Sequence, residues 1–217
     1  MMQLLRKRTS YSRAERLSDA VIHASGLTLV LIAVPVLITT AAFLRGDFTA
    51  MFGVSVYGLA LIAMILCSAL YNMVPEPGWE EVLKRLDHSA IYVKIAGTYT
   101  PFALLSSQGF WLLTGLWAAA FTGVGIKLVS PHRFRTLTIA LYLGMGWAGL
   151  LTGGAFLATL SAPVLILIVT GGLLYTAGVT FYLFERLPFH YTIWHVFVLT
   201  ASLVFYAAVT LHLVQSA

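Results

Sequence analysis

Seven apolar segments constrain the fold of this chain more than any other feature. They cover residues 20–44, 51–72, 88–107, 109–127, 135–156, 163–184 and 191–214. Each is close to the ~20 residues that an α-helix needs to cross the hydrocarbon core of a bilayer. No segment shows the alternation of a transmembrane β-strand, so helices alone can satisfy the backbone in lipid. The sequence therefore predicts an all-α membrane protein, a bundle of seven transmembrane helices.

Composition agrees with this prediction and with a single domain. Of the 217 residues, 59% are hydrophobic and only 10% are charged, whereas soluble domains carry about 25% charged residues. No polar segment is long enough to fold separately, so we expect residues 1–217 to form one seven-helix membrane domain. The first apolar segment is too long for the core of a signal peptide, which indicates a retained first helix.

The basic residues indicate how the bundle is oriented. Eleven of the 13 Lys and Arg residues lie before the first segment or beside the second, fourth and sixth connections. Arg45 stands alone on the opposite side, and Lys94 lies inside a segment. The positive-inside rule then predicts a cytoplasmic N-terminus and an external C-terminus. The same distribution accounts for the net charge of +5, so we expect membrane lipids as partners and no nucleic acid.

The longest connection, residues 73–87, has an amphipathic pattern. Trp79, Val82, Leu83 and Leu86 recur at helical spacing. This pattern predicts a short helix on the membrane surface, which would deliver Asp87 to the start of the third segment.

Polar residues gather at the predicted cytoplasmic ends of four segments. They are Asp19 and His23, Ser68 and Asn72, Asp87 and Lys94, and Tyr191 and His195. The members of each pair are four or seven residues apart and therefore share a helix face. Taken singly, each has a structural reading, such as a helix cap or a hydrogen bond between helices. Because ionisable residues in membrane helices usually mark functional sites, their convergence predicts a polar cavity near the cytoplasmic face.

Five stretches resemble the hemolysin III branch of the progestin and adipoQ receptor family. They are DAVIHASG at 19–26, SALYN at 68–72, LDHSAIYVKIAGTYTPF at 86–102, PHRFRTLTIALYLGMGW at 131–147 and YTIWHVFVL at 191–199. The resemblance covers nearly the whole chain. It implies a seven-helix bundle, a location in the bacterial cytoplasmic (inner) membrane, and a buried zinc site near the cytoplasmic face, similar to that of alkaline ceramidases.

The family's zinc ligands are only partly present. The resemblance implies histidines at positions 72, 191 and 195, with an acid at 87 and a serine at 68. This chain has Asn72 and Tyr191, so His195 is the one family ligand that remains. An amide is a poor zinc ligand, and a phenol must first lose its proton. We therefore expect far less than one zinc per chain, and no other cofactor.

Lys94 also departs from the family, which typically has an apolar residue there. With the zinc lost, Asp87 would need another positive charge. We expect the ammonium of Lys94 to remain inside the bundle, near Asp87, Asn72, Tyr191 or His195, and to replace the charge of the metal. The alternative is that Lys94 extends to water or to lipid phosphate.

Three functions remain open at this stage. The missing ligands favour a sensor or regulator of membrane lipids that uses the cavity without catalysis. The first alternative is a metal-dependent lipid amide hydrolase, with His195 on the metal, Asp87 orienting water and Ser68 beside them. The second is cytolysis, which only the family name implies.

Overall fold

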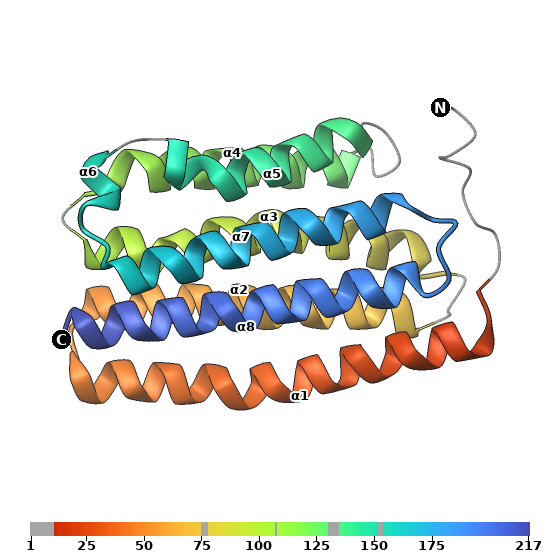
Figure 1. Cartoon of the computed structure of the whole chain (residues 1–217), viewed down its shortest axis with the longest axis horizontal. Helices are drawn as coiled ribbons and strands as arrows, with labels where there is room; N and C mark the ends of the chain where they lie inside the picture. The colour runs from red at the N-terminus through yellow and green to blue at the C-terminus, as the bar shows by residue number, and fades with distance from the viewer. Residues whose placement is uncertain (1–10, 75–77, 107, 130–134, 152–153) are drawn as a thin grey trace.

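The computed structural model describes residues 11–74, 78–106, 108–129, 135–151 and 154–217. Within these ranges the chain forms eight helices and no strand. They are α1 (Arg13–Leu44), α2 (Phe48–Met73), α3 (Glu80–Leu105), α4 (Phe110–Val129), α5 (Arg135–Leu151), α6 (Gly154–Leu157), α7 (Ala162–Leu183) and α8 (His190–Gln215). Apart from the four-residue α6, the helices lie side by side in one bundle with roughly parallel axes (Figure 1).

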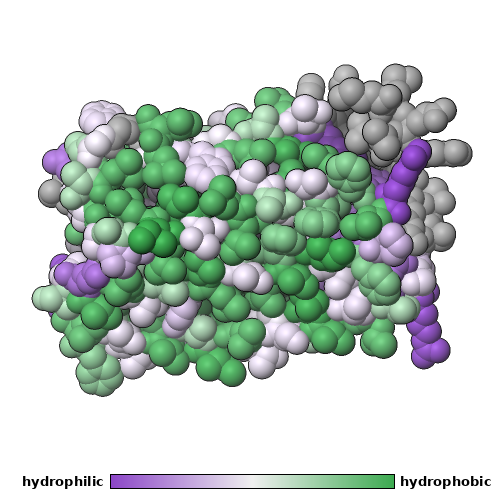
Figure 2. Space-filling view, viewed as in Figure 1, coloured by the Kyte–Doolittle hydropathy of each residue, from purple (hydrophilic) through white to green (hydrophobic). Residues whose placement is uncertain are grey.

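The surface and the helices together identify an integral membrane protein. Five helices, α1, α2, α4, α7 and α8, are long and apolar enough to cross a membrane. Large apolar side chains are exposed along them, including Ile32 at 63% and Ile166 at 65%. Figure 2 shows apolar residues along the length of the visible face and hydrophilic residues toward its ends. In water such a surface would aggregate, whereas in lipid it is solvated.

Two helices of the bundle fall short of that criterion, so seven spans remain a prediction. α3 carries Asp87, Lys94 and the charged turns before them, and α5 is shorter, with 17 residues. The described basic residues near helix ends, apart from Arg45, lie where α1, α3, α5 and α8 begin or α2, α4 and α7 end. We call this the basic end. The orientation of the bundle also remains a prediction, and Arg6, Lys7, Arg8 and Arg133, on which it partly rests, lie outside the described residues.

The predicted surface helix before Asp87 is wrong as a separate element. α3 begins at Glu80 and continues without a break to Leu105. Asp87 therefore lies about two turns inside the helix instead of at its start. No Gly or Pro interrupts the backbone between Glu80 and Asp87, and Arg85 pairs with Glu81 one turn earlier at 2.6 Å. The amphipathic turns and the apolar run are thus one rigid element.

α3 is enclosed by its neighbours in its second half. All eight residues from Ala96 to Ala103 are buried. A helix that is buried on every face lies within a bundle and not at its edge. Gly97 lets α2 approach, because a Cβ there would lie 2.7 Å from the Cβ of Ala60. The helix that carries Asp87 and Lys94 is therefore held from several sides.

Candidate functional site

The described residues enclose a cavity of about 890 Å³. Its lining comes from α1, α2, α3, α5, α7 and α8, with Lys127 from α4. Arg16, Lys84 and Arg135 line it at the basic end, and Trp147 and Phe205, in the second halves of α5 and α8, line it further from that end. The cavity thus extends from the basic end into the core.

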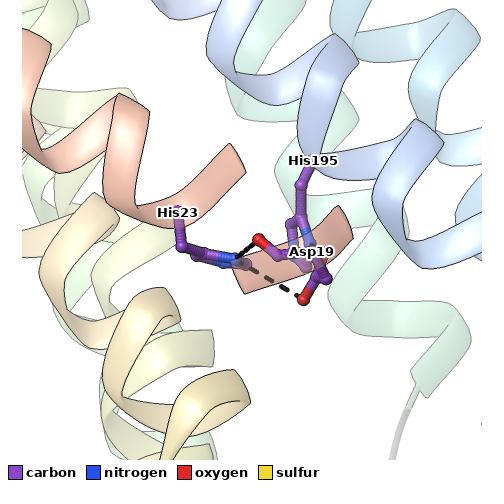
Figure 3. Close-up of side chains that lie close together, drawn as sticks. All are labelled: Asp19, His23 and His195. Carbon is purple, nitrogen blue, oxygen red and sulfur yellow. Dashed lines mark hydrogen bonds and ion pairs between the residues drawn. The ribbon is translucent and has the colours of Figure 1, made fainter. Parts of the chain in front are cut away.

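Asp19, His23 and His195 meet in the wall of this cavity (Figure 3). The Asp19 Oδ1 atom lies 2.5 Å from His195 Nδ1, and Oδ2 lies 3.5 Å from His23 Nδ1. The two imidazole rings pack edge to face, with centroids 4.3 Å apart. Only 4% of His23 and 7% of His195 is exposed. We call these three residues the Asp–His–His cluster.

The sequence positions this cluster by fixing the start of α1 against the start of α8. Ser12 and Glu15 form a capping box, in which each side chain accepts from the other residue's backbone N–H. The second carboxylate oxygen of Glu15 accepts from the Phe189 N–H at 3.0 Å, just before α8. One turn further, the hydroxyls of Ser18 and Thr192 lie 2.9 Å apart. Asp19, the residue after Ser18, then meets His195, which lies about one turn after Thr192.

Helices α2 and α3 add polar groups beside the cluster. The Ser68 Oγ atom lies 3.2 Å from His23 Nε2, and the Asp87 carboxyl group lies on the Ser68 side of the cluster. The amide nitrogen of Asn72 donates to the Ser68 carbonyl at 2.8 Å. His195 also interacts electrostatically with Asp87. The structure therefore brings Ser68 and Asp87 to the two histidines, and it leaves Asn72 bound within its own helix.

Tyr191 lies beside His195 as an aromatic neighbour. Their ring centroids are 5.4 Å apart, and Tyr191 also packs against Tyr11 and Tyr182. His190 turns elsewhere, with Nε2 3.2 Å from the Tyr11 hydroxyl. The residues at the three family positions thus offer one imidazole, an amide engaged with Ser68 and a phenol among aromatic rings. They do not fit zinc.

Lys94 is buried in the bundle, and the expected proximity to Asp87 is wrong. Its exposure is 3%, which excludes the lipid-facing alternative. The Nζ atom donates to Thr98 Oγ1 at 2.7 Å and lies 5.2 Å and 5.5 Å from the ring centroids of Tyr57 and Phe205. Thr98 is one turn further from Asp87, so the side chain extends away from that carboxylate. Among its described contacts, the Lys94 ammonium has the Thr98 hydroxyl and the rings of Tyr57 and Phe205, and no carboxylate.

Sequence reasoning placed Asp19 and His23 in the cavity but did not group them with His195 as one set. The four-residue spacing of Asp19 and His23 was the available signal, since it aligns both side chains on one face of α1. Glu15 was missed as the residue that joins α1 to α8, because it precedes the apolar run. Thr98 was missed as the partner of Lys94.

Comparisons with known proteins agree on one family. The family model described as "Haemolysin-III related" matches residues 12–206. The Hemolysin-3 homolog of Bacillus subtilis (strain 168) is 35% identical over 206 residues, which cover 93% of this chain and 95% of that protein. Hemolysin-3 of Bacillus cereus is 34% identical over 206 residues, with 94% of each chain covered. The monocyte to macrophage differentiation factor of Homo sapiens is 28% identical over 176 residues, 74% of this chain and 70% of that protein.

Proposed function

Because the chain belongs to the haemolysin-III-related family, we propose that it is a sensor or regulator of membrane lipids that binds a lipid molecule in its central cavity. The observation that carries this proposal is the cavity itself. Its volume of about 890 Å³ lies within the range of about 300–1,000 Å³ that is typical of ligand sites. Its walls include α1, α2, α7 and α8, which are long and apolar enough to cross a membrane.

The lining divides the cavity into two chemically distinct parts. At the basic end, Arg16 and Lys84 line it together with the Asp–His–His cluster. Deeper in the bundle, Ile95, Val198 and Leu199 line it together with Lys94, Thr98 and Tyr175. The charged end matches a lipid head group, and the apolar side chains of the deeper part match an acyl chain that would end near Lys94. The side chains at the basic end would select the head group, and the apolar depth would accept chains of limited length.

Binding at this position would be transmitted to helix contacts. The cluster joins α1 to α8 through the bond between Asp19 and His195. A head group that accepts from His195 would compete with that bond and weaken the junction at the basic end. A lipid ligand would thus shift the relative stability of two arrangements of α1 and α8, which is what a sensor requires.

The test is the amount of lipid that copurifies with a cavity-filling variant. Val198 lines the cavity, whereas Val196, two residues earlier on α8, is 41% exposed on the outer face. Val198→Trp should reduce the lipid retained per chain by at least about tenfold, because the indole would occupy the acyl-chain volume. Val196→Trp should retain the wild-type amount. Native mass spectrometry of protein in detergent measures both.

Two results would contradict the proposal. One is wild-type protein that carries no lipid after purification and takes up none from vesicles of a total bacterial lipid extract. The other is equal retention by both tryptophan variants, since the lipid would then bind the outer surface.

Metal-dependent hydrolysis of a lipid amide is a second candidate, favoured by the position of Asp87. A metal ion held by His195 would supply a water activated at neutral pH. Asp87, on the Ser68 side of His195, would be the general base. Ser68, between His23 and Asp87, would orient both.

Hydrolysis has a direct assay. Release of fatty acid from an N-acyl sphingoid lipid in mixed micelles should be measurable for the wild-type protein supplied with Zn²⁺. Asp87→Asn should lower the rate by about 10²–10⁴-fold, the range for loss of a general base. Absence of release by the wild type, or full activity of Asp87→Asn, would remove this candidate.

A further inference from the structure

We propose that Asp19, His23 and His195 form a divalent-metal site that has replaced the three-histidine set at positions 72, 191 and 195. The site goes beyond lipid binding and does not depend on it. Its ligand chemistry, one carboxylate and two imidazoles, suits a borderline metal such as Zn²⁺. His195 is common to both sets, and α1 supplies the two ligands that α2 and the start of α8 have lost.

The donor atoms already lie within reach of one metal ion. One donor atom from each of the three side chains lies within 4.8 Å of the other two. Around a tetrahedral zinc, donors at 2.0–2.2 Å from the metal are separated by about 3.3–3.5 Å. The Asp19–His195 pair, now 2.5 Å apart, would have to separate slightly and the other donors to approach. Asp19 and His23 share one face of α1, so side-chain rotations would serve for both.

The hydrogen bonds of the cluster prepare the imidazoles as ligands. His23 Nδ1 lies 2.9 Å from the backbone carbonyl of Asp19, which can only accept, so this nitrogen carries the proton. His23 Nε2 is then left with its lone pair, and it faces Ser68. The Asp19 carbonyl thus orients His23 as metal-bound histidines are usually oriented, through an oxygen acceptor on the second nitrogen. The Asp19 Oδ1 atom lies 2.5 Å from His195 Nδ1, so these two donor atoms already face each other, and a metal ion bound between them would take the place of the shared hydrogen.

Charge also favours a cation at this position. Asp19 contributes a carboxylate inside the bundle, and Asp87 adds a second one that interacts with both Asp19 and His195. The buried amine closest in sequence, Lys94, is engaged with Thr98 on the far side of Asp87. Asp19 and Asp87 therefore have no lysine or arginine among their described contacts. A divalent ion would supply that charge.

The cavity leaves room for further ligands. The three side chains lie in the cavity wall and not in solid packing. A three-ligand site that faces a cavity has an open position for water or for a lipid oxygen. Ser68, beside His23, is placed to donate to whatever occupies it.

The experiment measures metal in full-length protein purified in detergent, stripped with a chelator and reloaded with Zn²⁺ or Co²⁺. Wild-type protein should retain about one ion per chain after desalting and should melt at a higher temperature when loaded. Asp19→Asn and His23→Gln should each lower the affinity by more than about 100-fold, beyond the 10–100-fold typical of losing an outer partner. His212→Gln is the matched control, because His212 is a buried histidine on α8 near its other end. It should retain the metal.

Two further measurements make the assignment decisive. X-ray absorption of the zinc-loaded wild type should show two imidazoles, a readout that needs no variant to fold. Asn72→His with Tyr191→His, added to Asp19→Asn, should restore about one ion per chain with three imidazoles. The proposal is overturned by wild-type protein that binds no ion, by metal retained in His23→Gln, or by a wild-type spectrum with fewer or more than two imidazoles. Lipid content, measured on the same samples, reports separately on the proposed function.

Discussion

Replacing Lys94 by methionine should stabilise the protein. The side chain is 3% exposed and has no carboxylate among its described contacts. A buried charge without a partner costs about 3–5 kcal/mol relative to a satisfied arrangement. The compensating contacts are weaker, at about 1.5 kcal/mol for the hydrogen bond to Thr98 and about 0.5 kcal/mol for each ring.

The difference between the cost of burying the charge and the gain from these contacts gives the expected change in the free energy of unfolding. Methionine has similar length, keeps the contacts with the rings of Tyr57 and Phe205, and carries no charge. Thr98 would not be orphaned, since its hydroxyl also donates to the Lys94 carbonyl at 2.7 Å. We expect Lys94→Met to raise the free energy of unfolding by about 1–2 kcal/mol, which corresponds to a rise of about 2–8 °C in Tm for a chain of this size.

A double-mutant cycle isolates the hydrogen bond. Thr98→Val should destabilise the wild type by about 1.5–3 kcal/mol, because it removes the ammonium's acceptor. In the Lys94→Met background the same change should cost less by about 1 kcal/mol or more. Thermal unfolding monitored by size-exclusion fluorescence, with chemically denatured references, provides the values. Destabilisation by Lys94→Met of more than 2 kcal/mol would refute the reasoning and would mean that the lysine pairs with an anion that the protein binds.

Three other predictions follow from local geometry. Gly123→Ala should destabilise the bundle by about 1–3 kcal/mol, because its Cβ would lie 2.5 Å from the Tyr92 ring, whereas Gly125→Ala, facing open space, should not; equal melting temperatures would contradict this. The Asp47 carboxylate caps α2 by accepting from the Ala50 N–H at 3.0 Å, and this bond lowers the pKa of Asp47. The stability that the cap contributes is therefore present above the pKa of Asp47 in the unfolded chain and is lost as pH falls through its pKa in the folded protein. Asp47→Ala should abolish this decrease of Tm at acidic pH. Reporter fusions should place the basic end in the cytoplasm and the C-terminus outside, and a cytoplasmic C-terminus would reverse the orientation.

The sequence predicted the helices well where lipid contact shapes the side chains. The apolar runs of α2, α4, α7 and α8 match their helices within a few residues. Boundaries failed where a helix extends into polar surroundings. α1 begins at Arg13, seven residues before the apolar run, and α3 begins at Glu80 for the same reason. Hydropathy indicates whether a residue lies in lipid or in water, and it does not indicate whether the backbone is helical.

The sequence indicated which polar residues belong to the candidate site, but it did not indicate which of them contact one another. Periodicity placed Asp19 with His23 on one face, but it contains no information on which helix lies opposite. The pairing with His195 depends on Glu15 and Ser18, which fix α1 against α8. Likewise, the position of Lys94 in α3 indicated how far it lies from the basic end. The direction of its side chain follows from its hydrogen bond to Thr98, which the sequence did not indicate. Lateral helix order and rotamer choice are tertiary properties.

The enclosed second half of α3 has a consequence for biogenesis. During synthesis this helix emerges with Lys94 at its centre, and a lysine there opposes entry into lipid by about 2.5–3.5 kcal/mol. α3 is also not among the five helices that are apolar enough to cross alone. Its stable position therefore depends on neighbours that cover Ala96 to Ala103. α2 precedes it and α4 follows within a few residues. If α3 crosses the membrane, we expect the chain to hold it beside the insertion machinery until α4 is made, so that the three helices enter the membrane as a group.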